Sequence, residues 1–240
     1  MNAKLKQKSI LTLLITFVVA SILFLLPDAV VDHNSGFTSS ELEVKETIEN
    51  DVTSTSYVNS DGVITDAINI GYATVKRKQN ADGQVIEEFY FDAAENPVER
   101  YSGYYGISYE YNDNYVVIRY LGADRQPVMI GSGYSVIVRT LVDGKATDDF
   151  YYDLYMQPIQ CTGGYYGLHW ENDEQGQNCS VTYLNENGQP ILCASGYAIK
   201  MYQRDATGTV IGERYFDTKE NPAKSSLGQY GELYQREAHG

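Results

Sequence analysis

YYDLYMQPIQCTGGY, residues 151–165, is the stretch that decides the fold. A proline lies seven positions after its first tyrosine, and a Gly-Tyr pair begins six positions after that proline. The spacing recurs unchanged as Tyr90–Pro97–Gly103, Tyr120–Pro127–Gly133, Tyr151–Pro158–Gly164, Tyr183–Pro190–Gly196 and Tyr215–Pro222–Gly228. An earlier copy at residues 57–72 lacks the proline and carries one extra residue. Self-similarity at a fixed period of this length is typical of a repeat array.

A second, longer period lies on top of the first. The copies at Gly103 and Gly164 read Gly-Tyr-Tyr-Gly, whereas those at Gly133 and Gly196 read Gly-Tyr-Ser and Gly-Tyr-Ala. The last copy reads Gly-Gln-Tyr-Gly, with Gln229 in the place of the first tyrosine. The chain after residue 57 therefore holds about six half-units of ~31 residues, which form three units of ~62 residues.

Each half-unit predicts two strands. One runs into the first tyrosine, as in Val85–Asp92, and the other follows the Gly-Tyr pair, as in Tyr105–Tyr111. Both segments are rich in aromatic and β-branched residues, and no window shows a sustained helical period. Asp82-Gly83 and Asp143-Gly144 lie between strands and predict tight turns. We therefore predict an all-β, tandem β-hairpin array over residues 57–240, and the pattern leaves open whether it is a spiral, an open sheet or a solenoid.

The glycine before each tyrosine is the backbone position for which the pattern makes a sharp prediction. Glycine populates positive φ far more readily than other residues do. Its recurrence at one point of every half-unit predicts a positive φ, or a close approach of backbone, at that point.

The YFD-xxx-NP and GYYG runs resemble the tandem Tyr/Gly-rich hairpin repeats of surface proteins of Gram-positive bacteria. They are loosely similar to choline-binding-type cell-wall repeats and to YD repeats. The resemblance covers Tyr57–Gly240 and implies a role at the cell surface, but it transfers no ligand site. Wall-binding repeats are shorter and rich in tryptophan, whereas Trp170 is the only tryptophan of this chain.

The N-terminal residues predict the compartment. Ile10–Leu26 is a run of 17 residues without a charge, which as a helix would be about 25 Å long and just span a hydrocarbon core. Lys4, Lys6 and Lys8 precede this run and favour a cytoplasmic N-terminus. We therefore predict a cytoplasmic tail at 1–9, a single transmembrane anchor at 10–26 and an extracytoplasmic remainder in the cell membrane. A cleaved signal peptide is the alternative.

The segment after the apolar run is rich in Ser, Thr and acidic residues. Residues 33–56 predict a tether with a short helical turn around Ser40–Asn50. Three of the 18 basic residues and two of the 32 acidic residues lie before His33. The rest of the chain therefore contains 15 basic and 30 acidic residues. Such a negative surface repels phosphate backbones, so nucleic acid is not an expected partner.

A search for catalytic motifs predicts no enzyme, no cofactor and no metal site. The chain has no P-loop, HExxH, CxxC or Gly-x-Ser-x-Gly. Glu87-Glu88 and Asp148-Asp149 occupy equivalent repeat positions, but adjacent strand residues point to opposite faces and do not form an acid/base pair. We expect these doublets to be solvated charges that protect a sheet edge. His169 is expected to be a satisfied surface residue.

Two further sets of residues recur at matched positions. Asp92, Asp153 and Asp217 each follow an aromatic pair and are expected to cap turns through nearby backbone amides. Cys161 and Cys193 each lie three residues after a proline. They form either a disulfide between adjacent half-units or two small apolar fillers.

The tyrosines supply the candidate binding residues. Tyr72, Tyr104, Tyr134, Tyr165 and Tyr197 recur in five half-units, with Gln229 in the sixth, and predict a packing ladder.

The second tyrosines, Tyr105, Tyr166 and Tyr230, occur only in alternate copies, and a glycine follows each one. Because glycine has no side chain, each of these rings is predicted to border a shallow groove in which a sugar or a partner's side chain could stack on the ring. The alternative is that the rings pack within the protein. With Trp170 these three tyrosines are the predicted ligand-binding residues.

Three functions remain open on the sequence. The first is a membrane-anchored surface module that binds cell-wall glycan or a surface protein. The second is a structural spacer or scaffold without a ligand of its own. The third and weakest is a glycoside hydrolase that uses Asp and Glu side chains.

Overall fold

The computed structural model describes residues 36–173 and 176–234 and shows an all-β protein. Within these two ranges, the only helical element is a 3-10 turn, η1 at Ser39–Glu41. The predicted cytoplasmic tail at 1–9 and the predicted anchor at 10–26 lie outside the described residues. Within the described ranges, no helix is long and apolar enough to cross a membrane.

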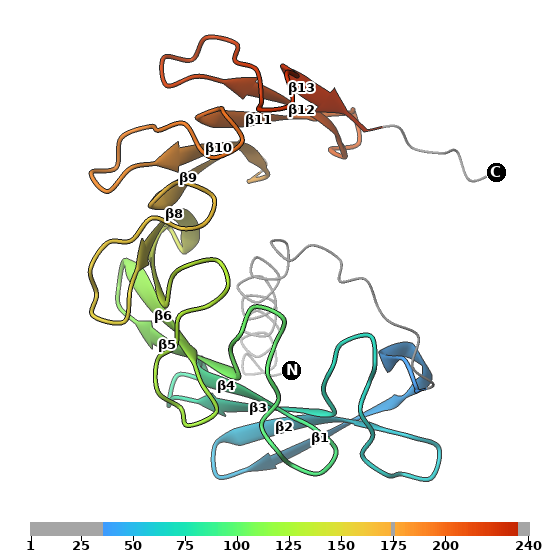
Figure 1. Cartoon of the computed structure of the whole chain (residues 1–240). Helices are drawn as coiled ribbons and strands as arrows, with labels where there is room; N and C mark the ends of the chain where they lie inside the picture. The colour runs from blue at the N-terminus through green and yellow to red at the C-terminus, as the bar shows by residue number, and fades with distance from the viewer. Residues whose placement is uncertain (1–35, 174–175, 235–240) are drawn as a thin grey trace, which may run out of the picture. The chain divides into compact units, whose positions relative to one another are not determined.

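Thirteen strands form one open sheet in which the spatial order follows the order along the chain (Figure 1). Neighbours joined by a hairpin are antiparallel, as β5 with β6 and β7 with β8 show. The predicted repeated hairpin is thus confirmed, and the open question of its form is settled as an open sheet. The strands are β1 Glu43–Glu49, β2 Val52–Val58, β3 Thr74–Gln79, β4 Val85–Phe91, β5 Gly106–Tyr111, β6 Tyr115–Leu121, β7 Val136–Val142, β8 Lys145–Tyr152, β9 Gly167–Asn172, β10 Asn178–Leu184, β11 Ile199–Arg204, β12 Val210–Phe216 and β13 Gly231–Leu233.

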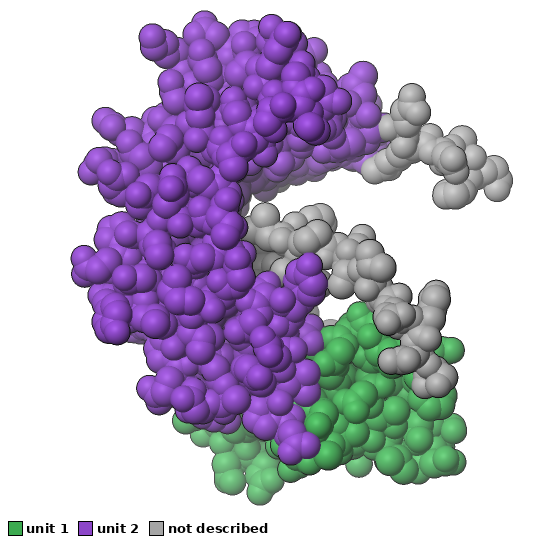
Figure 2. Space-filling model, in the orientation of Figure 1, with its two compact units in different colours: residues 1–85, 91–95 green, residues 86–90, 96–240 purple. Residues whose placement is uncertain are grey.

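The described residues divide into two compact units (Figure 2). The first unit holds residues up to 85 together with 91–95, and so contains β1, β2 and β3. The second holds 86–90 and the residues from 96 onward, and so contains β5 to β13. The second unit carries most of the repeat and all four predicted ligand-binding residues.

The segment interpreted as a tether contains a β-hairpin. Residues 43–58 form β1 and β2, which pair from Glu43 with Val58 to Glu49 with Val52. The predicted helical turn around Ser40–Asn50 is therefore wrong beyond η1. Val, Ile and Thr side chains in this segment favour strands. Every residue of β1 is exposed, so this strand lacks the apolar burial that makes a strand recognisable in a sequence.

The tight hairpin turns lie where the sequence predicts them. Asp143 and Gly144 join β7 to β8 with φ angles of 51° and 75°. Two successive positive φ angles match the twist of antiparallel strands, which explains the Asp-Gly pair. Gly83 and Gly208 also have positive φ, in the turns before β4 and β12.

At the opposite end of the sheet, each half-unit forms a long loop of two consecutive turns. In the loop after β8, Pro158 bridges back to Tyr152, and the backbone N–H of Cys161 then donates to the carbonyl of Tyr165 at 2.9 Å. One backbone hydrogen bond joins each long loop of the second unit to the next. These bonds run from Gly131 to Ser102 (2.7 Å), Thr162 to Ser132 (2.9 Å), Ala194 to Gly163 (2.8 Å) and Ser226 to Ser195 (2.6 Å).

A tyrosine ladder forms the core of the second unit and confirms the predicted packing role. Nine rings follow one another with centroid separations from 4.1 to 6.3 Å. Rings from strand ends alternate with rings from Gly-Tyr turns, in the order Tyr90, Tyr104, Tyr120, Tyr134, Tyr151, Tyr165, Tyr183, Tyr197 and Tyr215. In the first unit, Tyr57 and Tyr72 make the same kind of contact at 5.9 Å. The invariant spacing of the motif is what places successive rings in contact.

All six glycines that precede the ladder tyrosine or its replacement adopt positive φ, as the sequence predicts. The values lie between 69° and 89° at Gly71, Gly103, Gly133, Gly164, Gly196 and Gly228.

We expect Gly133→Ala to destabilise the protein by about 1–2 kcal/mol, because its φ of 87° places a Cβ against the following carbonyl. Gly131→Ala is the matched control, since its φ lies outside the left-handed region and a Cβ there meets nothing closer than 3.7 Å. Urea unfolding of both variants measures the difference. Equal stability of the two variants would contradict the role assigned to the φ angle.

Candidate functional site

The four predicted binding residues lie apart from one another. Tyr105, Tyr166 and Trp170 are half-buried, whereas Tyr230 is 54% exposed. Among the described residues, no ring contact joins any two of the four. Tyr105 donates a hydrogen bond to Glu99 at 3.3 Å, and the Lys224 ammonium lies 5.3 Å from the centre of the Tyr230 ring. The structure therefore spaces these rings along the array and does not gather them into one site.

The glycines beside the alternate tyrosines do not leave the predicted groove. Gly106 is the cross-strand partner of Phe89, and Gly167 is the partner of Phe150. A Cβ on either glycine would overlap the phenylalanine ring, so this ring already fills the space. At Gly231 the carbonyl of Glu213 occupies the same place. These glycines permit close approach of neighbouring strands, which corrects the groove hypothesis.

In each of the three units of ~62 residues, a buried carboxylate lies two positions before a tyrosine of the ladder. Glu88, Asp149 and Glu213 are only 6%, 1% and 8% exposed. The expectation of solvated edge charges is therefore wrong for Glu88 and Asp149, although the alternation of faces is confirmed by the half-buried Glu87 and Asp148. A buried carboxylate requires hydrogen-bond partners, and these come from other residues of the same sheet face.

Asp149 is held by a bidentate ion pair. The Arg139 guanidinium on β7 donates from Nε and from Nη2 to the two carboxylate oxygens, each at 2.8 Å. Burial lowers the pKa of Arg139, but the hydrogen bonds and the charge of Asp149 outweigh burial and raise it overall. The other side of Arg139 faces Trp170, whose ring centre is 5.7 Å from the guanidinium carbon. Trp170 thus shields a buried ion pair.

Glu213 has different partners in the same position. The hydroxyls of Tyr215 and Tyr234 donate to it at 2.6 and 2.8 Å, and the Lys200 ammonium lies 3.4 Å away. Burial opposes ionisation of Glu213, but these donors outweigh it and lower the pKa. In the first of the three units, Tyr90 donates to Glu88. The buried carboxylates are therefore satisfied by hydrogen bonds.

The half-buried neighbours of these carboxylates, Glu87 and Asp148, also take part in ion pairs. His169 Nδ1 lies 2.8 Å from Asp148, and Arg125 pairs with Glu87 while its guanidinium covers the Phe89 ring. The part of the chain that the structure describes contains no group of three or more His, Cys, Asp or Glu side chains arranged to hold a metal ion.

The turn-capping role predicted for the recurring aspartates is confirmed. Asp153 Oδ1 accepts hydrogen bonds from the backbone N–H groups of Tyr155 and Gln157 at 2.8 and 2.9 Å. Asp217 accepts two equivalent bonds, and Asp92 accepts one from Ala94 at 2.9 Å. These contacts fix the tips of three of the long loops.

Cys161 and Cys193 are free and buried. Of the two alternatives, the structure therefore shows small apolar fillers. Cys193 packs with Tyr197 and Tyr215 in the core, which accounts for a small side chain at this position.

An exposed apolar loop tip, formed by Leu154, Tyr155 and Met156, was not predicted from the sequence. These side chains are 41%, 81% and 42% exposed at the tip of the loop after β8. Met156 has a φ of 60°, an uncommon conformation for a residue with a side chain. A signal was present in the sequence, because the matched tips are largely polar. They read Ala-Ala-Glu at 93–95, Ala-Asp-Arg at 123–125, Glu-Asn-Gly at 186–188 and Thr-Lys-Glu at 218–220.

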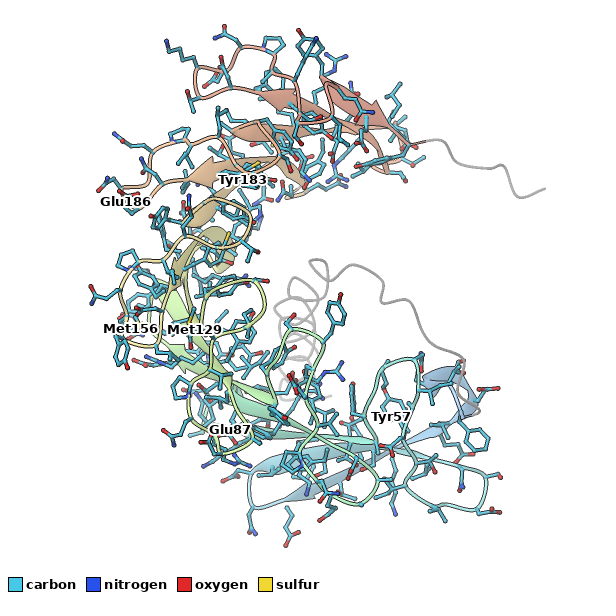
Figure 3. The ribbon with its side chains drawn as sticks, viewed as in Figure 1. Tyr57, Glu87, Met129, Met156, Tyr183 and Glu186 are labelled. Atoms are coloured by element: carbon cyan, nitrogen blue, oxygen red, sulfur yellow. The ribbon has the colours of Figure 1, made fainter. Side chains whose placement is uncertain are left out.

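The neighbouring loops extend this apolar character. Met129 is 37% exposed on the loop before β7, and Leu192 is 51% exposed on the loop before β11. Figure 3 labels Met129 and Met156 on successive long loops and Glu186 on the next. The apolar loop tip thus lies between two loops that each add one exposed apolar residue.

Comparison with protein-family models and with curated proteins gives no match. The resemblance to Gram-positive surface repeats therefore stays a prediction.

Proposed function

We propose that this chain is a membrane-anchored repeat module of the cell surface that binds a protein partner through its apolar loop tip. The exposure of Leu154, Tyr155 and Met156 carries the proposal. Exposed apolar clusters on a soluble surface mark interaction sites, and tyrosine is enriched among residues that contribute most to binding. The uncharged run Ile10–Leu26 and the preceding lysines support the placement at a membrane.

A protein partner is favoured over cell-wall glycan by the chemistry of the tip. Sugars are bound by flat aromatic faces together with several polar side chains, whereas this tip presents Leu and Met beside one Tyr. The acidic surface argues against nucleic acid as a partner. A structural spacer without a ligand is the alternative function, and it would leave the apolar tip without a purpose.

The test exchanges the tip for a matched loop of the same chain. Leu154→Thr, Tyr155→Lys and Met156→Glu together copy residues 218–220, which have the same turn with a positive φ at Glu220. We expect a fragment of residues 36–240 to bind isolated cell envelopes and the triple variant to bind at least about tenfold more weakly. Protease treatment of the envelopes should abolish binding of the original fragment.

The control is Thr218→Ala with Lys219→Ala, which copies residues 93–95 and should bind unchanged. Binding that survives protease but not glycan digestion would favour cell-wall glycan. Absence of binding in every sample would favour the spacer.

A further inference from the structure

β13 forms one edge of the described sheet (Figure 1). It begins at Gly231, the glycine after an alternate tyrosine, and therefore occupies the repeat position of β5 and β9. Those two strands are paired on both sides, β5 with β4 and β6, and β9 with β8 and β10. Within the described residues, β13 pairs with β12 alone. The chain thus contains two internal templates for a strand that would cover this edge.

The backbone of β13 directs hydrogen-bonding groups away from the sheet. The N–H of Tyr234 donates to the carbonyl of Ile211 at 2.8 Å, which sets the phase of the ladder between β12 and β13. The alternation of an antiparallel ladder then directs the N–H and carbonyl groups of Gly231 and Leu233 outward. Unpaired groups of this kind are a template for pairing with another chain.

The tyrosine before β13 has the same open position. In the interior of the array, the N–H of Tyr105 donates to Leu121 at 2.7 Å, and the N–H of Tyr166 donates to Leu184 at 2.8 Å. Tyr230 is their counterpart, and none of the described residues accepts a hydrogen bond from its N–H. An added strand would supply the carbonyl that β6 and β10 supply elsewhere.

Apolar surface accompanies this edge. Leu233 is 75% exposed, and Tyr230 is more than half exposed. Both line a cavity of about 470 Å³, together with Phe216 and Pro222. This volume lies within the range of ligand sites, roughly 300–1,000 Å³. The surface beside β13 can therefore bury apolar side chains of an added strand.

Glu232 determines which kind of strand fits. Ile107 and Leu168 occupy its position in β5 and β9, and both are buried. Glu232 is exposed and makes no hydrogen bond or ion pair with any residue that the structure describes. Its cross-strand partner is Glu213, and like charges directly opposite each other are destabilising. A cation on an added strand would offset this repulsion.

The templates locate that cation. Tyr120 lies opposite Ile107, and Tyr183 lies opposite Leu168. A strand added in the same register places its corresponding residue opposite Glu232.

We propose that the edge of β13 binds an extended segment of another protein, antiparallel and in this register, with Lys or Arg opposite Glu232. Main-chain hydrogen bonds supply affinity in such strand addition, and side chains supply specificity. A second copy of this chain is disfavoured as the occupant, because its net charge of −14 repels an identical acidic surface. The proposal is independent of the apolar loop tip, which lies on a different loop.

The experiment measures binding of fluorescent peptides to the full chain in lipid nanodiscs by fluorescence anisotropy. The parent peptide is Ser-Val-Thr-Tyr-Leu-Asn-Glu-Asn, residues 180–187 of β10 and the loop after it. We expect the peptide with Tyr183→Lys to bind at least about tenfold more tightly than the peptide with Tyr183→Glu. Glu232→Lys in the chain should reverse this order, because the charge opposite the peptide changes sign.

N-methylated peptides test the backbone pairing. In the chain, the N–H of Tyr183 donates to Ala198 at 2.8 Å on the side away from β9, so the N–H of Thr182 is directed toward β9. In the peptide with Tyr183→Lys, N-methylation of residue 182 should therefore abolish binding. N-methylation of residue 183 is the matched control and should preserve it.

Three results would overturn the proposal: no binding of the lysine peptide, equal binding of the lysine and glutamate peptides, or equal effects of the two N-methyl groups. Self-association of the unchanged chain that the lysine peptide displaces would identify a second copy as the occupant and would also overturn it.

Discussion

The protein is expected to unfold cooperatively as the pH rises from about 10 to 12, because the tyrosine ladder must stay neutral. A tyrosine in an unfolded chain ionises near pH 10. Burial raises the pKa of every ring in the ladder, and it raises the pKa of Tyr134 to about 12. A raised native pKa means that the unfolded state loses protons first. The stabilisation is therefore complete below pH 10 and is lost as the pH rises toward the native values.

Three fully buried rings show the size of this effect. Tyr90, Tyr120 and Tyr151 are at most 9% exposed. Each contributes a loss of about 1.4 kcal/mol per pH unit above 10, or about 4 kcal/mol together, against a typical total stability of 5–15 kcal/mol.

Phenolate absorbance and circular dichroism, recorded in parallel, should therefore change together at one pH. Tyr151→Phe keeps the ring and removes one ionising group, so its transition should move to higher pH. Gradual appearance of phenolate while the sheet signal persists would contradict this account.

The second large effect is expected at the buried ion pair. Asp149→Ala leaves the Arg139 guanidinium, which is 7% exposed, without its partner. Removal of one member of a buried pair costs about 3–5 kcal/mol, because the remaining charge is neither solvated nor neutralised. Urea unfolding should show a loss of this size for Asp149→Ala.

A double variant distinguishes the cost of leaving one buried charge unpaired from the cost of changing side chains at these two positions. Arg139→Met with Asp149→Leu removes both charges and keeps apolar volume, so it should be more stable than Asp149→Ala. If the single variant costs less than about 1 kcal/mol, the pair behaves as a solvent-screened surface pair, and its assignment as a buried charge fails.

The arrangement of strands could be predicted from the sequence because it follows from local spacing. The constant interval from Tyr151 through Pro158 to Gly164 specifies both the turn and the ring that the turn presents. The hairpin of β1 and β2 could not be predicted in this way, since all of β1 is exposed and its composition is that of a linker.

The surroundings of the candidate residues were predictable only in part. The burial of Asp149 depends on Arg139, which comes from a neighbouring strand, and no single-strand pattern records that partner. The grooves expected beside Tyr105 and Tyr166 are absent because Phe89 and Phe150 cross over from the adjacent strand. By contrast, the apolar loop tip was visible in the sequence, and comparison of the five matched tips would have found it.

The two ends of the sheet tolerate change in sequence length differently. The interval from Tyr to Gly, which crosses a long loop, is identical in all five copies, whereas the stretch from Gly164 to Tyr183 is two residues longer than that from Gly103 to Tyr120. Ring contacts of the ladder and loop-to-loop hydrogen bonds constrain the long loops, whereas the tight turns place no ring in the ladder. Insertions and deletions should therefore accumulate at the tight turns during evolution. Because each hairpin pairs only with its neighbours, duplication or loss of a whole unit would change the reach of the array without disturbing the remaining units.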